Sequence, residues 1–144
     1  MFGKCFLRLF GSGRLPPDGA SLIAADPSAL IAESLVCSIT FVNFRAPGRY
    51  SSWRRQWFLG SLAVAKDRLV AYRYRKRLVN VPWDDRRVRQ ITFSVPQPSC
   101  LLLAYDASLF QPTWSGIIEL CFTTGDAERV LRAIEAGIRH LGRT

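Results

Sequence analysis

The spacing of apolar residues changes once along this chain, near residue 124, and this change constrains the fold more than any other feature. Before it, short runs rich in Val, Ile, Leu and Phe are separated by turn-forming residues, as is typical of β-strands. After it, apolar residues recur at helical spacing and form one stripe. The stripe consists of Ala127, Val130, Leu131, Ile134, Ile138 and Leu141. We therefore predict several strands followed by one amphipathic helix.

We predict seven strands from the runs that precede this helix. They cover residues 34–44, 57–64, 68–75, 78–81, 88–94, 100–105 and 114–123. Short antiparallel strands of this kind curl into a barrel-like sandwich with open ends, and a helix with one apolar face can plug such an end. The expected fold is therefore mainly β: a split barrel of seven antiparallel strands capped by a C-terminal α-helix.

Most aromatic residues of the strand-like runs are expected in the core, because large rings in such runs are usually buried. They are Trp57, Phe58, Phe93, Trp114 and Phe122. Trp53 and Trp83 stand beside runs of Arg and Asp, so we expect them at the surface. Trp53 is also a candidate for a membrane interface, where amphipathic rings concentrate.

The chain divides into a short leading segment and one domain. Its 144 residues, 49% hydrophobic and 22% charged, fit a single globular domain. Breakers at residues 11–13 and 16–19 predict a linker. We therefore assign residues 1–28 to a basic tail with its linker and residues 29–143 to the domain. Residues 1–10 carry no secretory signal pattern. We expect a frayed or locally packed tail there, and the alternative is a short amphipathic helix lying on a membrane.

The four cysteines are far apart and include no C-x-x-C pair, so no zinc site is expected. Cys37 and Cys121 lie in apolar runs and are predicted to be small buried hydrophobic residues in a reducing compartment. A disulfide between these two residues stays open if their strands are neighbours. The expected location is cytoplasmic, with peripheral contact to a membrane as an option.

The net charge of +9 is concentrated in one part of the chain. Residues 45–89 hold 13 Lys and Arg against 3 Asp, whereas the remaining residues are close to neutral. A concentrated positive excess inside a foldable domain indicates an anionic partner. The alternative is a solvated, Arg-rich surface that pairs in part with Asp67, Asp84 and Asp85.

Eight of these basic residues are candidates for an anion-binding rim. They are Arg45, Arg49, Arg54, Arg55, Arg73, Arg75, Lys76 and Arg77. The first four flank the connection between the first two predicted strands, and the last four occupy the connection between the third and fourth. Arg73, Arg75 and Arg77 alternate, which would place them on one face of an extended strand. Guanidinium groups bind phosphate through two hydrogen bonds, so such a rim suits a lipid headgroup.

Motifs of enzymes are missing from the sequence. It contains no G-x-S-x-G, Walker A, G-x-G-x-x-G or H-E-x-x-H motif. Asp84 and Asp85 are followed by arginines that keep both carboxylates ionised, so we interpret them as a turn with surface ion pairs. His140 is the only histidine and suits a helix end. We expect no enzyme activity, no catalytic residue, no metal and no cofactor.

Three short motifs resemble the pleckstrin-homology (PH) superfold. WRRQWFL at residues 53–59 resembles the start of the second strand of PH domains, where a Trp and basic residues precede an aromatic pair. KDRLVAYR at residues 66–73 and LVNVPWDD at residues 78–85 resemble the bacterial PH and GRAM-like variety. The resemblance covers about residues 30–142. It implies that the two basic connections open at the same end of the barrel, where the candidate residues could converge.

Two departures from the PH pattern affect the expected ligand. Gln56 stands where PH domains that bind phosphoinositides tightly carry a second basic residue, and the predicted terminal helix lacks a Trp. Both departures fit the bacterial or GRAM-like branch, in which some members mediate protein contacts or self-assembly. They weaken any transfer of specific phosphoinositide recognition to this chain.

The function expected from these features is binding. We favour a non-catalytic PH-like module that uses a basic rim to contact an anionic membrane surface or headgroup. The alternative is a protein-interaction or self-assembly module, which includes a homo-oligomer. Nucleic-acid binding ranks last, because the basic run matches no recognisable nucleic-acid motif.

Overall fold

The computed structural model describes residues 14–24 and 26–141, so residues 1–13 of the tail and linker expected at 1–28 lie outside the described part. The strands are β1 (Leu30–Ala46), β2 (Arg49–Val64), β3 (Arg68–Arg73), β4 (Lys76–Pro82), β5 (Thr92–Gln97), β6 (Cys100–Asp106) and β7 (Ser115–Thr123). The helices are α2 (Pro17–Ile23) and α3 (Ala127–Leu141), with short 3-10 helices η1 (Arg86–Gln90) and η2 (Ala107–Leu109). The expected mainly β fold is confirmed.

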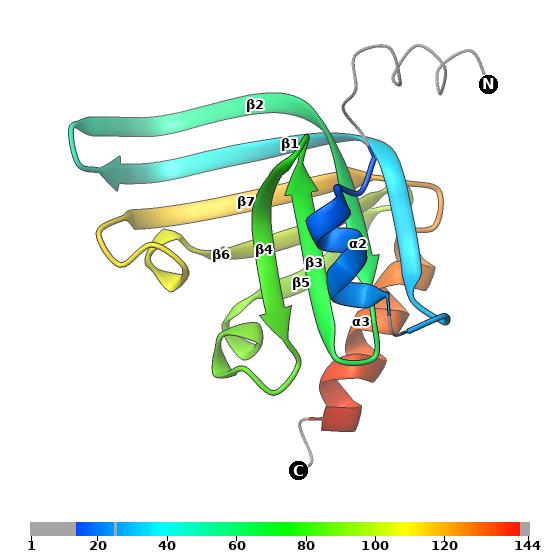
Figure 1. Cartoon of the computed structure of the whole chain (residues 1–144). Coiled ribbons are helices and arrows are strands. Elements are labelled where there is room, and N and C mark those ends of the chain that lie inside the picture. Colours follow the sequence, from blue (N-terminus) through cyan, green and yellow to red (C-terminus); the bar gives the residue numbers. More distant parts are fainter. Residues whose placement is uncertain (1–13, 25, 142–144) are drawn as a thin grey trace.

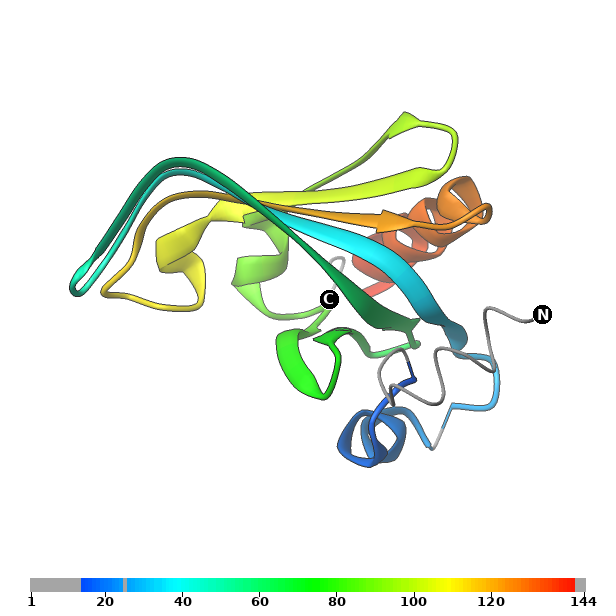
Figure 2. The same cartoon turned by 90° about the horizontal axis from the view of Figure 1, so that it is seen from above.

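All seven strands belong to one antiparallel sheet in the order β4-β3-β2-β1-β7-β6-β5. The sheet is strongly curled, so the molecule is a half-barrel (Figure 1). β1 and β2 are the longest strands, and their paired ends extend as an arm that bends over the concave side, where η2 lies (Figure 2). We call the concave face of the sheet the inner face and the opposite one the outer face.

The bend of the arm starts at an irregular pairing of β1 with β7. The register shifts between Val42 and Arg45, and Asn43 adopts a φ of 48°. Gly116 lies opposite with a φ of 101°, and a Cβ atom built on it would be 2.5 Å from the carbonyl oxygen of Asn43. Only glycine tolerates both this conformation and this close approach of two backbones.

The main core lies between the inner face and α3. The predicted apolar stripe of α3 faces the sheet: Ala127, Val130 and Ile134 are buried, and the helix packs against β5 and β6. The last turn of the helix includes His140, whose side chain lies outside the described part. A one-sided helix is held in this position chiefly by burial of its apolar stripe.

Trp83 is the largest fully buried side chain, which corrects our expectation that it is exposed. Only 1% of it is accessible. Its indole Nε1 donates a hydrogen bond of 2.9 Å to the carbonyl oxygen of Ala65. Gly137 of α3 provides the space, since a Cβ atom there would lie 2.5 Å from the indole. The polar neighbours of Trp83 in sequence therefore say nothing about the environment of its ring.

A second, smaller core covers the outer face of β2 and β3. Ile23 of α2 packs there with Ala63, Val70 and Tyr72. The hydroxyl of Tyr72 donates to a carboxylate oxygen of Asp18 at 2.8 Å. Burial first and this acceptor second raise the pKa of Tyr72 to about 12. Where we expected a linker at residues 16–19, the chain therefore begins a helix that packs on the domain.

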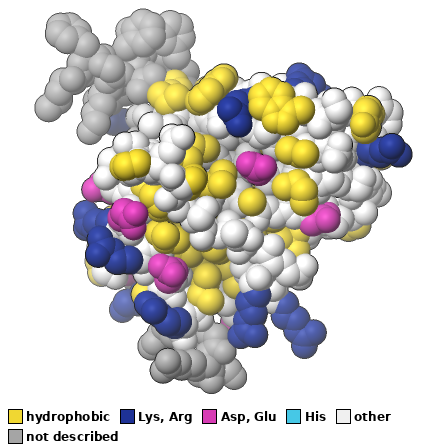
Figure 3. All heavy atoms as spheres, turned by 180° about the vertical axis from the view of Figure 1, so that it is seen from behind, with side chains coloured by type: hydrophobic (Ala, Val, Ile, Leu, Met, Phe, Trp, Pro, Cys, Tyr) yellow, Lys and Arg dark blue, Asp and Glu magenta, His cyan; other side chains and the backbone are white. Residues whose placement is uncertain are grey.

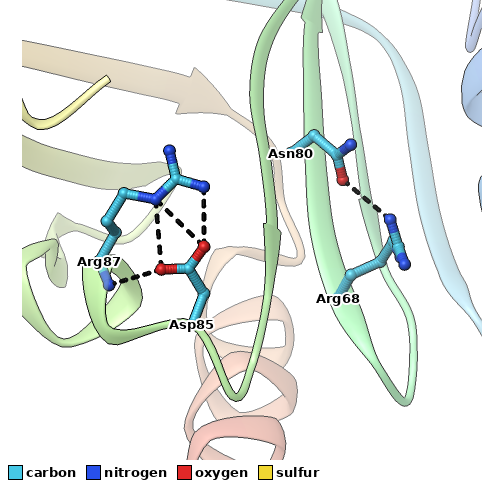
Figure 4. A network of polar contacts seen from close by, with 4 residues as sticks. All are labelled: Arg68, Asn80, Asp85 and Arg87. Carbon is cyan, nitrogen blue, oxygen red and sulfur yellow. Dashed lines mark hydrogen bonds and ion pairs between the residues drawn. The ribbon is translucent and has the colours of Figure 1, made fainter. Parts of the chain in front are cut away.

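The segment before β5 differs from the prediction. We expected a strand from residue 88, but residues 86–90 form η1 and the strand begins at Thr92. Asp85 precedes this 3-10 helix and caps it. Its carboxylate accepts a hydrogen bond from the backbone N–H of Arg87 at 2.9 Å and forms an ion pair with the guanidinium of Arg87 at 2.7 Å (Figure 4). This local hydrogen bonding competes with extended structure. It also confirms a surface ion pair at the Asp-Asp turn.

The aromatic predictions are only partly confirmed. Phe58 and Phe122 are buried, and Phe93 and Trp114 are half-buried against the core. Trp57 is 64% exposed, so the prediction that it lies in the core was wrong. Successive side chains of a strand alternate between faces. Because Phe58 occupies the inner face, Trp57 must occupy the outer one.

The cysteines also correct the prediction in part. Cys37 is fully buried, as expected, and burial raises the pKa of its thiol to about 12. Cys121 is half-buried and forms a disulfide with Cys100 between β7 and β6, with 5.9 Å between their Cα atoms. A Cys37–Cys121 disulfide is contradicted: Ser38 is the residue paired with Cys121, and Cys37 points to the inner face.

Candidate anion-binding cleft

The concave side of the sheet contains a cleft of about 960 Å³. Three parts of the chain surround it: the inner face of the β1–β2 arm, the tip of the β3–β4 hairpin, and the segment from the end of β6 through η2 to residue 114. In Figure 2 the bent arm and η2 enclose this side of the molecule. The cleft therefore depends on the bend at Asn43 and Gly116.

Six basic residues line the cleft, and we call them the cleft cations. They are Arg49, Arg54, Arg73, Arg75, Lys76 and Arg77. No Asp or Glu lines it among the described residues. Among the ion pairs of the described residues, one involves a cleft cation: Arg77 lies 3.9 Å from Asp18, and both side chains of that pair are about half exposed. The cleft therefore carries a positive charge that the described residues leave largely uncompensated.

The hairpin at Arg73 to Arg77 differs from the extended strand that we predicted. β3 ends at Arg73, which pairs with Lys76 at the start of β4, and Tyr74 adopts a φ of 53° between them. Arg75 lies in this two-residue turn, so Arg73, Arg75 and Arg77 do not lie along one strand. The tight turn nevertheless brings all three to the cleft, together with Lys76.

Arg73 is the most strongly positioned of the cleft cations. One of its terminal nitrogens donates to the side-chain oxygen of Gln56 at 3.2 Å. Its guanidinium carbon lies 5.4 Å from the centre of the Phe58 ring, a distance at which a cation and an aromatic face attract. Gln56 therefore orients a cation of the cleft.

Aromatic side chains form the bottom of the cleft, and we call them the aromatic floor. They are Phe41, Phe44, Tyr105, Phe110 and Trp114. Phe44 contacts Phe41 and Trp114, with ring centres 4.7 and 5.2 Å apart, and Tyr105 contacts Phe110 at 5.3 Å. Burial raises the pKa of Tyr105 to about 12, so its phenol is neutral at physiological pH. The floor is consequently uncharged and largely apolar.

Two of the eight predicted rim residues lie away from the cleft, on the outer face of the arm. Arg55 donates from Nε to the hydroxyl of Thr40 at 2.8 Å and stacks on Trp53 at 5.1 Å. Arg45 stacks on Tyr50 at 5.1 Å. Strand alternation explains the separation, because Arg54 and Arg55 are neighbours in sequence and must point to opposite faces.

Trp53, the candidate for a membrane interface, shares this outer face. It is 59% exposed. Figure 3 shows the molecule from behind, where hydrophobic, basic and acidic side chains are interspersed. The cleft cations differ from this mixed surface because no described carboxylate stands among them.

Two other arginines of the 45–89 segment, Arg87 and Arg68, have polar partners. Arg87 is paired with Asp85, and Arg68 contacts the side-chain oxygen of Asn80 at 3.2 Å (Figure 4). Arg68 also contacts Asp67 at 3.3 Å. The hydrogen bond from Arg87 holds the pKa of Asp85 below its usual value. Arg68 and Arg87 therefore differ from most of the cleft cations in having a carboxylate partner.

Sequence reasoning did not find the aromatic floor. Its members come from β1, β6 and the segment after η2, and none of them is close to a predicted rim residue except Phe44. Alternation along residues 39–44 does indicate that Ile39 and Phe41 share a face, but not that this face meets Phe110 and Trp114. Only the curling of the sheet brings these residues together.

No protein-family model matches the chain, and a comparison with curated proteins finds no match. In residues 14–24 and 26–141, no three His, Cys, Asp or Glu side chains are grouped to hold a metal ion. No helix within the same residues is both long and apolar enough to span a bilayer. The chemistry of the cleft is therefore the basis for interpreting its function.

Proposed function

We propose that this protein is a non-catalytic, PH-like binding module whose cleft cations contact an anionic membrane surface or headgroup. The observation that carries the proposal is the convergence of six cationic side chains, from the arm and from the β3–β4 hairpin, on a cleft without acidic residues among those described. The sheet order and the C-terminal helix are consistent with a PH-like fold. We further propose that the protein lies at the periphery of a membrane.

Electrostatics makes an anionic surface a suitable partner. A basic residue near an anionic membrane contributes on the order of 1 kcal/mol, so several of them acting together give useful affinity. Five of the six cleft cations are arginines, whose planar guanidinium groups bind phosphate oxygens through two hydrogen bonds. Because such contacts are screened by salt, binding should be strong only at low and moderate ionic strength.

Cosedimentation with vesicles tests this proposal. The protein should pellet with phosphatidylcholine vesicles that contain phosphatidylserine, and not with pure phosphatidylcholine, and added salt should release it. The double variant Arg54→Gln/Arg75→Gln removes two cleft cations and should weaken binding about 30-fold, from roughly 1 kcal/mol for each charge.

A matched control separates the cleft from net charge alone. Arg45→Gln/Arg55→Gln removes the same charge from the outer face and should leave binding within about threefold of the unmodified protein. If both double variants weakened binding equally, the protein would respond to total charge and the cleft would have no particular role. If neither variant mattered, the proposal would be wrong.

The outer face supports a second candidate function, which is self-assembly. Large hydrophobic side chains are exposed on it: Val36, Trp53, Trp57 and Ile117. Val42 pairs with both Trp53 and Ile117, so Trp53, Val42 and Ile117 form one row across β2, β1 and β7. Exposed apolar patches of this kind are common at protein interfaces. Light scattering at high salt should detect a dimer that Trp57→Lys disrupts, whereas a monomer at all concentrations would contradict this candidate.

A further inference from the structure

The cleft combines cationic side chains with an apolar, aromatic floor, and contact with a headgroup needs only the cations. The cleft cations account for the attraction of an anion, but they stand above an aromatic floor in which Phe44 and Tyr105 are buried and Phe41, Phe110 and Trp114 are half-buried. A site for phosphate alone does not require five aromatic rings. Apolar surface of this kind gains free energy when a hydrocarbon group displaces water from it.

Resting on the proposed function, we propose that the cleft binds one anionic lipid molecule, with its headgroup among the cleft cations and an acyl chain on the aromatic floor. The volume of about 960 Å³ lies within the roughly 300–1,000 Å³ of typical small-molecule sites. Arg49, Ser51 and Arg54 of β2 all line the cleft, and Ser51 is paired with Phe44 of the floor. Charged and apolar contacts are thus available to one molecule.

The composition of the floor argues for a hydrocarbon chain rather than a nucleobase. Ile39, Ala107 and Ile118 also line the cleft beside the aromatic rings, and these three side chains have no hydrogen-bonding groups. A base buried here would leave some of its polar edge unpaired, which is costly, whereas an acyl chain has no polar edge. Gln56, one of the polar side chains that line the cleft, already accepts a hydrogen bond from Arg73.

Calorimetric titration with decyl phosphate, kept below its micelle concentration, tests the inference without a membrane. The compound should bind one to one and at least about 100-fold more tightly than ethyl phosphate, because each buried methylene group adds affinity after the cost of association is met. Added salt should weaken both. Equal affinity for the two phosphates would overturn the inference, while vesicle binding through the cations would still stand.

Variants at two neighbouring residues provide the control. Ser51→Trp should fill the cleft and weaken decyl phosphate binding at least about tenfold. Ser52→Trp adds the same ring at the next position, which is exposed and outside the cleft lining, and should leave this affinity unchanged. Equal effects of the two variants would contradict the assignment. If Ser51→Trp does not fold, Phe110→Ala, outside the strands, should weaken decyl phosphate binding at least fivefold, by roughly one lost hydrophobic contact.

Two further outcomes distinguish the proposals from each other. Tight binding of decyl phosphate without any binding to anionic vesicles would support the acyl-chain cleft and contradict the membrane-docking function. Displacement of decyl phosphate by a thymidine oligonucleotide would indicate a nucleic-acid ligand instead and would overturn the inference.

Discussion

Gly116 illustrates how one residue shapes the cleft. Its φ of 101° lies in a region that residues with a side chain rarely adopt. A Cβ atom built on it would lie 2.7 Å from the carbonyl oxygen of Val42 and 2.5 Å from that of Asn43. The two strands therefore cross closely at the point where the arm bends. A larger residue would have to push the strands apart and would straighten the arm.

We expect Gly116→Ala to lower the free energy of unfolding by more than about 1 kcal/mol, because alanine suits neither the φ nor the space. Gly125→Ala is the control: nothing lies within 4 Å of a Cβ atom there, and its effect should be small. Urea denaturation followed by circular dichroism measures both. Equal stability of the two variants would show that the close approach at Gly116 is easily relieved.

Asp85 provides a test of pH dependence. Hydrogen bonds from Arg87 lower its pKa from the usual 3.8, so the folded state favours the ionised carboxylate. Its contribution is therefore complete above the unfolded pKa of 3.8 and is lost as the pH falls through the lower folded value. The exposed position and solvent screening limit the ion pair itself, so most of the effect should come from the start of η1.

Asp85→Asn should therefore destabilise the protein by at most about 1 kcal/mol at pH 7. The difference between Asp85→Asn and the unmodified protein should shrink as the pH falls below 3.8. Asp84→Asn, at the neighbouring exposed position, should have little effect at any pH. Thermal unfolding at several pH values checks this, and a loss that grew towards low pH would contradict the expected sign.

At the scale of elements, α3 and the turn after β4 depend on each other. The ring of Trp83 lies against the helix at Gly137, and its Nε1 is held by Ala65. Glycine inside a helix normally costs about 1 kcal/mol relative to alanine. Glycine is nevertheless required here, because a Cβ atom would lie 2.5 Å from a fully buried ring that a hydrogen bond fixes in place.

The sign of one substitution tests this contact. Helix propensity alone predicts that Gly137→Ala stabilises the protein by about 1 kcal/mol. We expect a destabilisation instead, because the indole must move and its hydrogen bond weakens. Ala136→Gly, on the exposed side of the same turn, should show the ordinary loss of about 1 kcal/mol. A more stable Gly137→Ala variant would mean that α3 shifts freely on the sheet.

At the scale of the whole molecule, the unequal distribution of charge should limit stability without a ligand. The cleft cations repel one another where no described carboxylate compensates them. Added sodium chloride should therefore raise the melting temperature of the free protein. Arg54→Gln should raise the melting temperature at low salt and reduce its dependence on salt. Arg55→Gln, which loses its contacts with Thr40 and Trp53, should not raise the melting temperature. Differential scanning calorimetry at two salt concentrations compares them, and a melting temperature that falls with salt would contradict the expectation.

Much of the fold was predictable because it depends on local patterns. Period-two alternation indicated the last strand, and the helical stripe indicated α3. The prediction failed where contacts between distant residues decide. The carboxylate of Asp85 accepts a hydrogen bond from the backbone of Arg87, so η1 begins where a strand was expected. The indole of Trp83 donates a hydrogen bond to Ala65, 18 residues earlier in the sequence. Residues 49–56 extend β2 because they pair with β1, not because they are apolar.

By itself, the sequence determined that this protein is a sheet of seven antiparallel strands with a terminal helix, and that its excess charge is confined to residues 45–89. Only the tertiary structure decided which of those charges come together. Alternation sends Arg54 and Arg55 to opposite faces, and the bend at Gly116 brings the inner face of the arm towards the β3–β4 hairpin and the aromatic floor. The reason is physical: local patterns specify the faces of each strand, whereas the curvature of the sheet specifies which faces meet.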